Sequence, residues 1–348
     1  MRMKRRDFLK YMALGGIGLS GITKLGDFFV PFAEAVAMPQ FSFAHMTDLH
    51  LDVRGKDSWQ YRGKSVALFI DALRQLGRLQ KLNFILFGGD QIQSGPNDRE
   101  SLTVFQTWVE QLDVPYYMLL GNTEVSPIPG VSKLTREDYL RAWNGRGPRR
   151  GSSSWAFDPA PGVRFIGFDV TVEGKPYGEA TPKGLRWLER ELASNRKKKL
   201  IIVATHQLLL PTTPLDLTPA WSLWLVRNHA QVRELLARFP NVRLVVSGHH
   251  HATRVQTEGR ITYVSDPAIV TYPCAFRIFT VNRDGIHLRN IGLDDRATVS
   301  RARDLLIADP YARIYDPEDP KKVLSYTAGF TDEDRELFIK LKSEEGAS

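Results

Sequence analysis

The chain has 348 residues, of which 43% are hydrophobic and 25% charged, an ordinary globular composition with enough length for one large domain or two small ones. Its single cysteine, Cys274, excludes an intramolecular disulfide and a cysteine-rich zinc site. Beyond the first 37 residues, 41 bases and 36 acids leave a net charge of +5, which suits small anionic substrates but gives no strong signal for nucleic acid.

The first 37 residues have the pattern of an export signal. A charged head, "KRRDFLK", precedes a short apolar, glycine-rich stretch and the small residues "AVA" before Met38. This order predicts a secretory signal and not a stable transmembrane span, unless the signal is retained. The pair Arg5 and Arg6 resembles the twin-arginine type. We therefore expect the twin-arginine export machinery as a partner and a periplasmic or extracellular location.

From Gln40 onward, short apolar runs alternate with amphipathic stretches. The first three pairs are "FSFAHMTD" with "SVALFIDALRQLGRL", "NFILFGGD" with "SLTVFQTWVEQL", and "VPYYMLLGN" with "TREDYLRAW". Each apolar run ends in a polar cluster. The alternation predicts an α/β fold, in which loops at strand ends carry the functional sites.

The second half of the chain adds hairpins to this pattern. After a polar loop over residues 144–154, "SWAFDPAPGVRFIGFDV" predicts a hairpin with a Pro-Gly turn, and Thr181 is predicted to cap the helix "TPKGLRWLERELASN". Then follow the strand "LIIVATHQ", the helix "LWLVRNHAQVRELLARF", the strand "VRLVVSGHHH" and two hairpin-like segments, "TRVQTEGRITYVSD" and "AFRIFTVNRDGIHLRNI". These late hairpins predict a mixed sheet and not a purely parallel one.

The patterns divide the chain into three parts. We expect the signal over 1–37, one domain over 38–293, and a charged, helical C-terminal extension over 294–348 that packs on the domain. The sequence contains no internal repeat, low-complexity tract, P-loop or dinucleotide fingerprint.

Five predicted strand ends carry side chains able to bind a divalent cation. Any one of them alone is typical of a helix cap or a local hydrogen bond, but together they indicate a metal centre. Two ions held about 3.5 to 4 Å apart share an anionic ligand and need further nitrogen and oxygen donors. The residues are Asp48, His50, Asp90, Asn122, His206, His249 and His251.

The spacing within these motifs suggests how the side chains are arranged. On an extended backbone, residues at i and i+2 lie on one side, which would bring Asp48 beside His50 and His249 beside His251. The intervening His250 would then point the other way. Asp90, alone on a turn after two glycines, suits the shared ligand.

The ordered set D-x-H, GD, GN, a strand-end histidine and GH-x-H resembles the calcineurin-like metallophosphoesterase family over about Phe41 to Asn290. The resemblance implies a fold of two mixed β-sheets sandwiched by helices. It also implies one metal ion bound by Asp48, His50 and His251, a second bound by Asn122, His206 and His249, and a bridge formed by Asp90. The stretches "THQLLLP" and "RELLARFPNVRLVVSGHHH" resemble the branch that contains bacterial cyclic-nucleotide phosphodiesterases.

The same resemblance implies an exported, dinuclear-metal phosphoesterase that hydrolyses small phosphate esters, diesters more than monoesters, by attack of metal-activated hydroxide. Asp90 and Asn122 would serve catalysis as metal ligands. Purple acid phosphatases have a tyrosine in GD-x-x-Y that binds ferric iron, whereas this chain has Gln93 at that position. We therefore expect two divalent ions, Mn, Zn or ferrous Fe.

One position departs from the family pattern. Members usually have a histidine directly after the asparagine, where it commonly protonates the leaving group, but this chain has Thr123. A hydroxyl is too weak an acid for that role, and loss of a general acid reduces the rate by ~10² to 10⁴, less for a good leaving group. His250 and Tyr61 are the alternative proton donors, with a structural role as the competing interpretation for each. Thr123 thus predicts an altered substrate or a slower enzyme.

Two other functional classes stay open at this point. One is a binding module that holds metal in the same fold but is catalytically weak or inert. The other is a nuclease, which needs a basic groove with aromatic residues that stack on bases. Trp221 and Trp224 are at i and i+3, a spacing that predicts packing on a helix face instead.

Overall fold

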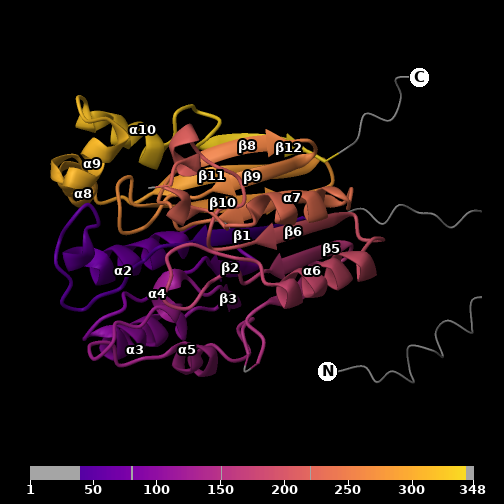
Figure 1. Cartoon of the computed structure of the whole chain (residues 1–348), viewed down its shortest axis with the longest axis horizontal. Helices are drawn as coiled ribbons and strands as arrows, with labels where there is room; N and C mark the ends of the chain where they lie inside the picture. The colour runs from indigo at the N-terminus through magenta and orange to yellow at the C-terminus, as the bar shows by residue number, and fades with distance from the viewer. Residues whose placement is uncertain (1–39, 80, 150, 220, 342–348) are drawn as a thin grey trace, which may run out of the picture. The chain divides into compact units, whose positions relative to one another are not determined.

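The structure of the chain, a computed structural model, describes residues 40–341 apart from 80, 150 and 220. This part of the chain forms two six-stranded sheets, with strand orders β12-β11-β10-β1-β2-β3 and β4-β5-β6-β7-β9-β8 (Figure 1). The strands of the first sheet are β1 (Phe41–Met46), β2 (Phe84–Phe87), β3 (Tyr116–Met118), β10 (Ala275–Val281), β11 (Gly285–Gly292) and β12 (Glu336–Lys340). Those of the second are β4 (Trp155–Ala160), β5 (Val163–Gly167), β6 (Leu200–Ala204), β7 (Val242–Ser247), β8 (Arg254–Glu258) and β9 (Ile261–Ser265).

Both sheets are mixed. In the first, β1, β2 and β3 run parallel, whereas β10, β11 and β12 continue antiparallel on the other side of β1. In the second, β5, β6, β7 and β9 run parallel, and β4 and β8 pair antiparallel at the two edges. The three hairpins predicted from the sequence are the pairs β4–β5, β8–β9 and β10–β11.

Helices connect the strands and cover the sheets. The longer ones are α2 (Ser65–Leu76), α3 (Asp98–Val109), α5 (Arg136–Ala142), α6 (Pro182–Ser194), α7 (His229–Ala237) and α8 (Arg296–Ala308). The Thr181 side chain accepts a hydrogen bond from the Gly184 N–H at the start of α6, as predicted. The helix predicted over "LWLVRNHAQVRELLARF" begins only at His229, because Leu223 and Trp224 belong to the short 3₁₀ helix η3 (Ser222–Trp224) and the residues over 225–228 form isolated bridges and a turn.

Three apolar cores separate these layers. In β1, Phe41 and Phe43 lie in the core between the two sheets, while Ala44 and Met46 face the core beneath α2 and α3. Residues such as Val203 of β6 face a third core beneath α6 and α7. Central strands buried on both faces read as continuous apolar runs. The expected fold, two mixed sheets sandwiched by helices, is therefore confirmed.

A buried ion pair also links the two sheets. His45 of β1 and Arg277 of β10 come from the first sheet, and Asp266 directly follows β9 of the second; all three are fully buried. His45 Nδ1 lies 2.6 Å from Asp266 Oδ2, and Arg277 Nε donates to Asp266 Oδ1. Arg277 also donates to the Asp334 carbonyl at 2.9 Å. The Arg277 guanidinium and the Asp266 carboxylate thus pair opposite charges in a buried region.

The C-terminal part of the chain is helical at first and then joins a sheet. After α8 come α9 (Pro310–Tyr315), η4 (Pro320–Lys322) and α10 (Val323–Ala328), which lie close together in Figure 1. Strand β12 then pairs with β11, although the sequence predicted only helix here. The predicted signal over 1–37 lies outside the described residues. Within 40–341, with its three gaps, no helix has the length and apolar character needed to cross a bilayer.

Candidate metal centre

The metal-binding residues predicted from the sequence lie together at the carboxyl ends of five parallel strands. Asp48 and His50 follow β1, Asp90 follows β2 and Asn122 follows β3, all in the first sheet. His206 follows β6, and His249 and His251 follow β7, in the second sheet. Sites in α/β folds form at this edge. The seven side chains are contributed by turns of both sheets, so the centre lies where the two sheets meet.

Their backbone conformation differs from the prediction. The i and i+2 spacing was expected to act through extended backbone, but five of these residues have positive φ: Asp48 (54°), His50 (41°), Asp90 (53°), His249 (67°) and His251 (54°). Such angles are uncommon for residues other than glycine and persist only where the surroundings enforce them. The prediction of extended backbone was therefore wrong, and strained turns bring the side chains together.

Two glycines allow this close approach. A Cβ atom on Gly89, whose φ is +103°, would lie 2.3 Å from His206 Nδ1. A Cβ atom on Gly121 would lie 2.1 Å from Asp90 Oδ1. Any larger residue at either position would displace a ligand side chain, which explains the glycines in "GGD" and "GN".

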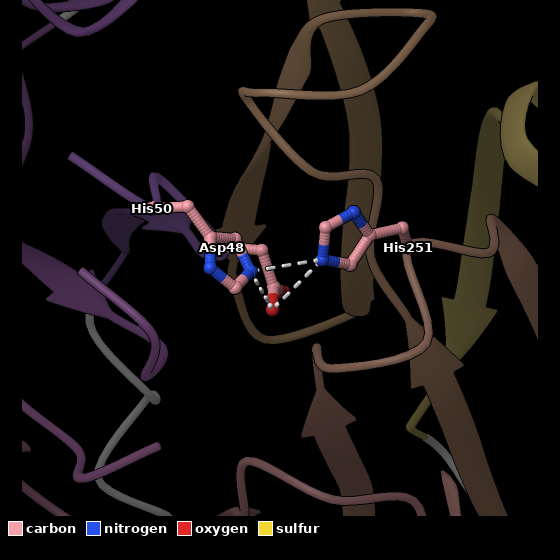
Figure 2. A group of neighbouring side chains, drawn as sticks. All are labelled: Asp48, His50 and His251. Carbon is pink, nitrogen blue, oxygen red and sulfur yellow. Dashed lines mark hydrogen bonds and ion pairs between the residues drawn. The ribbon is translucent and has the colours of Figure 1, made fainter. Parts of the chain in front are cut away.

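The first group of side chains comprises Asp48, His50 and His251 (Figure 2). His251 Nε2 lies 3.3 Å from both Asp48 Oδ1 and His50 Nε2. Asp48 Oδ2 accepts hydrogen bonds from the Thr47 hydroxyl and the His249 N–H, whereas the buried Oδ1 has no hydrogen-bond donor. An unpartnered buried carboxylate oxygen facing two imidazole nitrogens fits a divalent cation.

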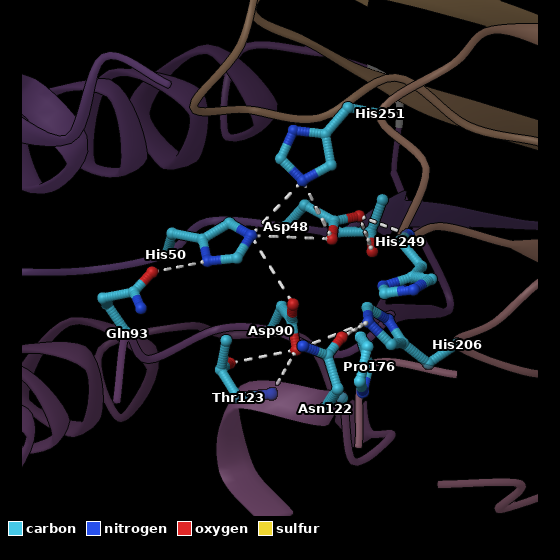
Figure 3. A network of polar contacts seen from close by, with 12 residues as sticks. Asp48, His50, Asp90, Gln93, Asn122, Thr123, Pro176, His206, His249 and His251 are labelled. Carbon is cyan, nitrogen blue, oxygen red and sulfur yellow. Dashed lines mark hydrogen bonds and ion pairs between the residues drawn. The ribbon is translucent and has the colours of Figure 1, made fainter. Parts of the chain in front are cut away.

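The second group comprises Asp90, His206 and His249 (Figure 3). His206 Nε2 lies 3.3 Å from both Asp90 Oδ1 and Asn122 Oδ1. The other oxygen of Asp90, Oδ2, lies 3.5 Å from His50 Nε2 in the first group. Asp90 therefore directs one oxygen to each group, which is the arrangement that a bridging carboxylate requires.

Each of the four histidines has one ring nitrogen engaged by a partner outside the centre. His50 Nδ1 lies 2.9 Å from Gln93 Oε1, and His206 Nδ1 lies 2.8 Å from the Gly88 carbonyl. His249 Nε2 lies 3.2 Å from the Leu223 carbonyl, and His251 Nδ1 lies 2.7 Å from the Thr271 hydroxyl. Metal-binding histidines are held in this way, since the outer hydrogen bond fixes the tautomer and leaves the other nitrogen free. The residues thus fit a pair of metal ions.

Burial and mutual charge also prepare these groups for metal binding. Burial lowers the pKa of His50 to about 4 and that of His249 to about 3, so both imidazoles are neutral at pH 7. For Asp48 and Asp90, burial acts to raise the pKa, but nearby histidines, chiefly His251 and His206 respectively, hold it well below its ordinary value. His206, beside Asp90, has a pKa raised to about 9 against the effect of burial. A metal ion would therefore displace a proton from His206.

Glu124 supports the turns, a role that the sequence analysis missed. Its side chain is buried and accepts hydrogen bonds from the N–H groups of Asp90 (3.0 Å), Ile92 (2.9 Å) and Gly121 (2.8 Å). Burial, together with the Asp90 charge, raises the pKa of Glu124 to about 8. The carboxylate ties the turn after β2 to the turn after β3. The acidic residue at the end of "GNTE" was the signal that could have indicated it.

The histidine between the two ligands of the last turn has other partners. His250 is fully buried, with Nδ1 3.0 Å from the Thr212 hydroxyl and Nε2 3.4 Å from the Tyr315 hydroxyl. Its ring stacks on Trp224 at 5.0 Å. With both nitrogens directed at hydroxyls and no exposed surface, His250 does not present a proton to solvent. Tyr61, the other donor considered, packs against the core beneath α2 and α3.

Comparison with known proteins agrees with this geometry. The family model "calcineurin-like phosphoesterase" matches residues 41–253. A "probable glycerophosphodiester phosphodiesterase" of Arcobacter nitrofigilis is 26% identical over 212 residues, 61% of this chain and 71% of that protein. A "3',5'-cyclic-nucleotide phosphodiesterase" of Nostoc is 24% identical over 296 residues, 82% of this chain and 97% of that one. The crystal structure of a dimetal phosphatase from Danio rerio superposes with a TM-score of 0.60 at 18% identity, covering 72% of this chain and 96% of that structure, and so shares the fold.

Proposed function

Since the chain belongs to the calcineurin-like phosphoesterase family and is a metal-dependent hydrolase of phosphoric esters, we propose that it cleaves small phosphodiesters outside the cytoplasm. The observation that carries the metal-dependent chemistry is the position of Asp90, whose two oxygens face the two groups of ligands. The preference for diesters is supported by the curated relatives, whose names describe phosphodiesterases.

Each residue of the centre has a definite part in this proposal. Asp48, His50 and His251 would hold one divalent ion, Asn122, His206 and His249 would hold the other, and Asp90 would contact both. Ions at these positions would supply Lewis acidity to the phosphate oxygens and lower the pKa of a water molecule toward ~7. Gln93, Thr271 and the carbonyls of Gly88 and Leu223 would keep the imidazoles oriented.

Thr123 holds the bridging carboxylate in this arrangement. Its N–H and its hydroxyl both donate to Asp90 Oδ1, at 2.8 and 2.9 Å (Figure 3). Two donors on one oxygen fix the rotation of the carboxylate, so that Oδ2 points to the first group. A side chain that fixes a ligand in this way strengthens metal binding without touching the substrate.

The proposed function is tested by comparing a diester and a monoester of the same phenol. The mature chain, stripped by a chelator and reloaded with Mn²⁺ or Zn²⁺, should hydrolyse bis-p-nitrophenyl phosphate faster than p-nitrophenyl phosphate. Activity should disappear with the metal and return with it. If the chain binds two metal ions but cleaves neither compound, the metal-binding module is the better description.

We also propose that the segment over 1–37 directs export by the twin-arginine route, as its "KRR" head and "AVA" sequence predict. Replacing Arg5 and Arg6 with lysine keeps the charge but removes the arginine pair. In a bacterium that has this route, the wild-type chain should be found in the periplasm and the double variant in the cytoplasm. Equal export of both would contradict the proposal.

A further inference from the structure

We propose that this site acts on phosphorus compounds whose leaving group is acidic, either the phosphate of an anhydride or a phenolic oxygen, because the side chains of the centre offer no proton to the departing oxygen. The inference rests on the proposed function and concerns its substrate class. Among the described residues it is carried by the hydrogen-bond partners and burial of Thr123, the histidines, Glu124, Tyr311 and Tyr315.

The residue after Asn122 is the first such position. Thr123 is buried, and its hydroxyl proton is directed to Asp90 Oδ1. The Ser94 hydroxyl donates to the Thr123 carbonyl, which fixes the backbone of the same residue. The Thr123 hydroxyl therefore already donates its hydrogen bond to the bridging carboxylate. As an alcohol it would also be a poor proton donor to a leaving group.

All eight histidines of the chain lie in the described residues, and each has an assigned environment. Four belong to the ligand groups. His45 is buried beside Asp266, and His250 is buried between Thr212 and Tyr315. The last two are outside the centre. His229 lies beside Arg233 on α7, and His287 of β11 pairs with Glu336 of β12.

The acidic and phenolic side chains around the centre are also engaged. Glu124 is buried within the turns, and both of its oxygens accept backbone N–H groups, so the proton that its raised pKa retains stays inside the turns. Tyr311, which stacks on Trp59, and Tyr315, whose hydroxyl contacts His250, hydrogen-bond to each other through their hydroxyls at 2.9 Å. Burial raises the pKa of Tyr311 above its ordinary value, which makes it a weaker acid still.

The consequence follows from the balance of the reaction. A water molecule releases one proton to the solvent and its oxygen forms a bond to phosphorus, while the bond from phosphorus to the leaving oxygen breaks with the electron pair remaining on that oxygen. Without a proton donor the leaving group departs as an anion and takes its proton from water afterwards. The rate then falls as the basicity of the leaving oxygen rises. In an enzyme that has a general acid, that acid raises the rate by ~10² to 10⁴ and so reduces this dependence. An alkoxide is the poorest leaving group under these conditions, whereas phosphate and phenolate are good ones.

The test is the dependence of kcat/KM on the leaving group in the metal-loaded chain. Diesters that share one phosphoryl part but carry p-nitrophenolate, phenolate or an alkoxide are compared, and a diphosphate diester is assayed beside them. We expect a fall of at least about 10²-fold from the p-nitrophenyl to the alkyl ester. Comparing kcat/KM for the diphosphate diester with that for the p-nitrophenyl diester shows whether an anhydride or an aryl ester is the better substrate.

Two variants sharpen the measurement, and the metal content of each is determined first. Thr123→His introduces an acid and should reduce the difference between the aryl and alkyl esters by about 10²-fold or more. Thr123→Ser keeps the hydroxyl that donates to Asp90 and should retain the wild-type difference. If Thr123→His does not hold two metal ions, the wild-type series alone decides.

The possible failures are distinct from one another. Alkyl and aryl esters cleaved by the wild type at similar rates would overturn the inference and leave the proposed function standing. Hydrolysis of no ester at all by a chain that holds two metal ions would overturn the proposed function itself.

Discussion

Two regions surround the metal centre, the strand-end turns that carry the ligands and the C-terminal segment, residues 309–328, and they reach it by different means. The turns place polar side chains at the centre through positive φ angles and backbone hydrogen bonds. The C-terminal segment contributes aromatic rings that pack against the tryptophans beside the ligand histidines and against His250. The difference teaches that the turns determine which atoms face a metal ion, whereas the segment contacts the residues that lie next to the rings carrying those atoms.

One aromatic contact path leads from α9 to the first group of ligands. The Trp59 ring lies 4.8 Å from the His251 ring on one side and stacks on Tyr311 at 4.2 Å. Asp309 joins the two partners, because its Oδ2 accepts from the Trp59 N–H at 3.0 Å and its Oδ1 accepts from the Tyr311 N–H at 2.9 Å. The loop that carries Trp59 is thereby fixed to the start of α9.

A second series of aromatic contacts leads from α9 to the group formed by Asp90, His206 and His249. Tyr315 contacts the Trp221 ring at 4.7 Å and His250 through its hydroxyl. Trp224 lies 5.0 Å from both His250 and the ligand His249. Trp224 therefore lies beside the candidate ligand His249, and Trp221 lies one ring further away. The sequence analysis was wrong to expect both on the face of a regular helix. Both metal groups have a tryptophan behind one histidine.

The largest effect is expected at the turn that both groups share. Asp90→Ala removes the carboxylate that faces both sets of ligands, so we expect the loss of bound metal and of measurable hydrolysis while circular dichroism shows a retained fold. Elemental analysis of the purified variant checks this. Asp294→Ala, at an exposed acid on the same protein, is the control and should keep its metal. Two metal ions per chain in Asp90→Ala would refute the bridging role.

The next effect is on stability and concerns the buried ion pair that links the two sheets. Arg277→Leu leaves the fully buried Asp266 without its guanidinium and removes the hydrogen bond to the Asp334 carbonyl. Removing one partner of a buried pair costs about 3 to 5 kcal/mol of unfolding free energy. Denaturant unfolding measures it, with exposed Arg289→Leu on β11 as the control, expected to change the free energy by less than about 0.5 kcal/mol. Equal stability of the two variants would show that the buried pair does not stabilise the fold.

A smaller effect is expected from the hydrogen bond that orients His50. Gln93→Leu removes the acceptor for the His50 Nδ1–H, so metal affinity at the Asp48, His50 and His251 group should fall by roughly 100-fold, the upper end for such partners. Gln93→Glu keeps an acceptor and should bind close to the wild type. Calorimetric titration of the metal-free protein with Zn²⁺ measures both variants. If Gln93→Leu binds as well as the wild type, the hydrogen bond has no such role.

The smallest effect is expected in the C-terminal segment. Tyr311→Ala removes the ring that stacks on Trp59. Gln93 contacts the ligand His50 directly, whereas Tyr311 reaches the ligand His251 only through Trp59, so this variant should weaken metal binding by only roughly 10-fold. Ile314→Ala, on the same helix but 53% exposed, is the matched control. The same titration compares them. Equal metal affinity in the two variants would mean that the segment only packs beside the centre.

The difference between the two regions also explains what the sequence could predict. The seven candidate ligands, which the structure brings together, were identifiable because metal chemistry allows few residue types and the strands before them are continuous apolar runs. The strained backbone of the turns was not, since a positive φ on Asp or His leaves no pattern in the sequence. The contacts of Trp59 with Asp309 and Tyr311 join residues about 250 positions apart, that of Tyr315 with His250 spans 65 positions, and all depend on tertiary packing alone. Strand β12 was missed because its pairing with β11 also depends on the folded sheet.

The most direct test of a dinuclear centre is anomalous X-ray diffraction from crystals of the manganese-loaded chain. The account predicts two anomalous peaks about 3.5 to 4 Å apart, one beside Asp48, His50 and His251 and the other beside Asn122, His206 and His249, with Asp90 between them. A single peak, or a pair of peaks that does not include Asp90 as a shared ligand, would contradict it.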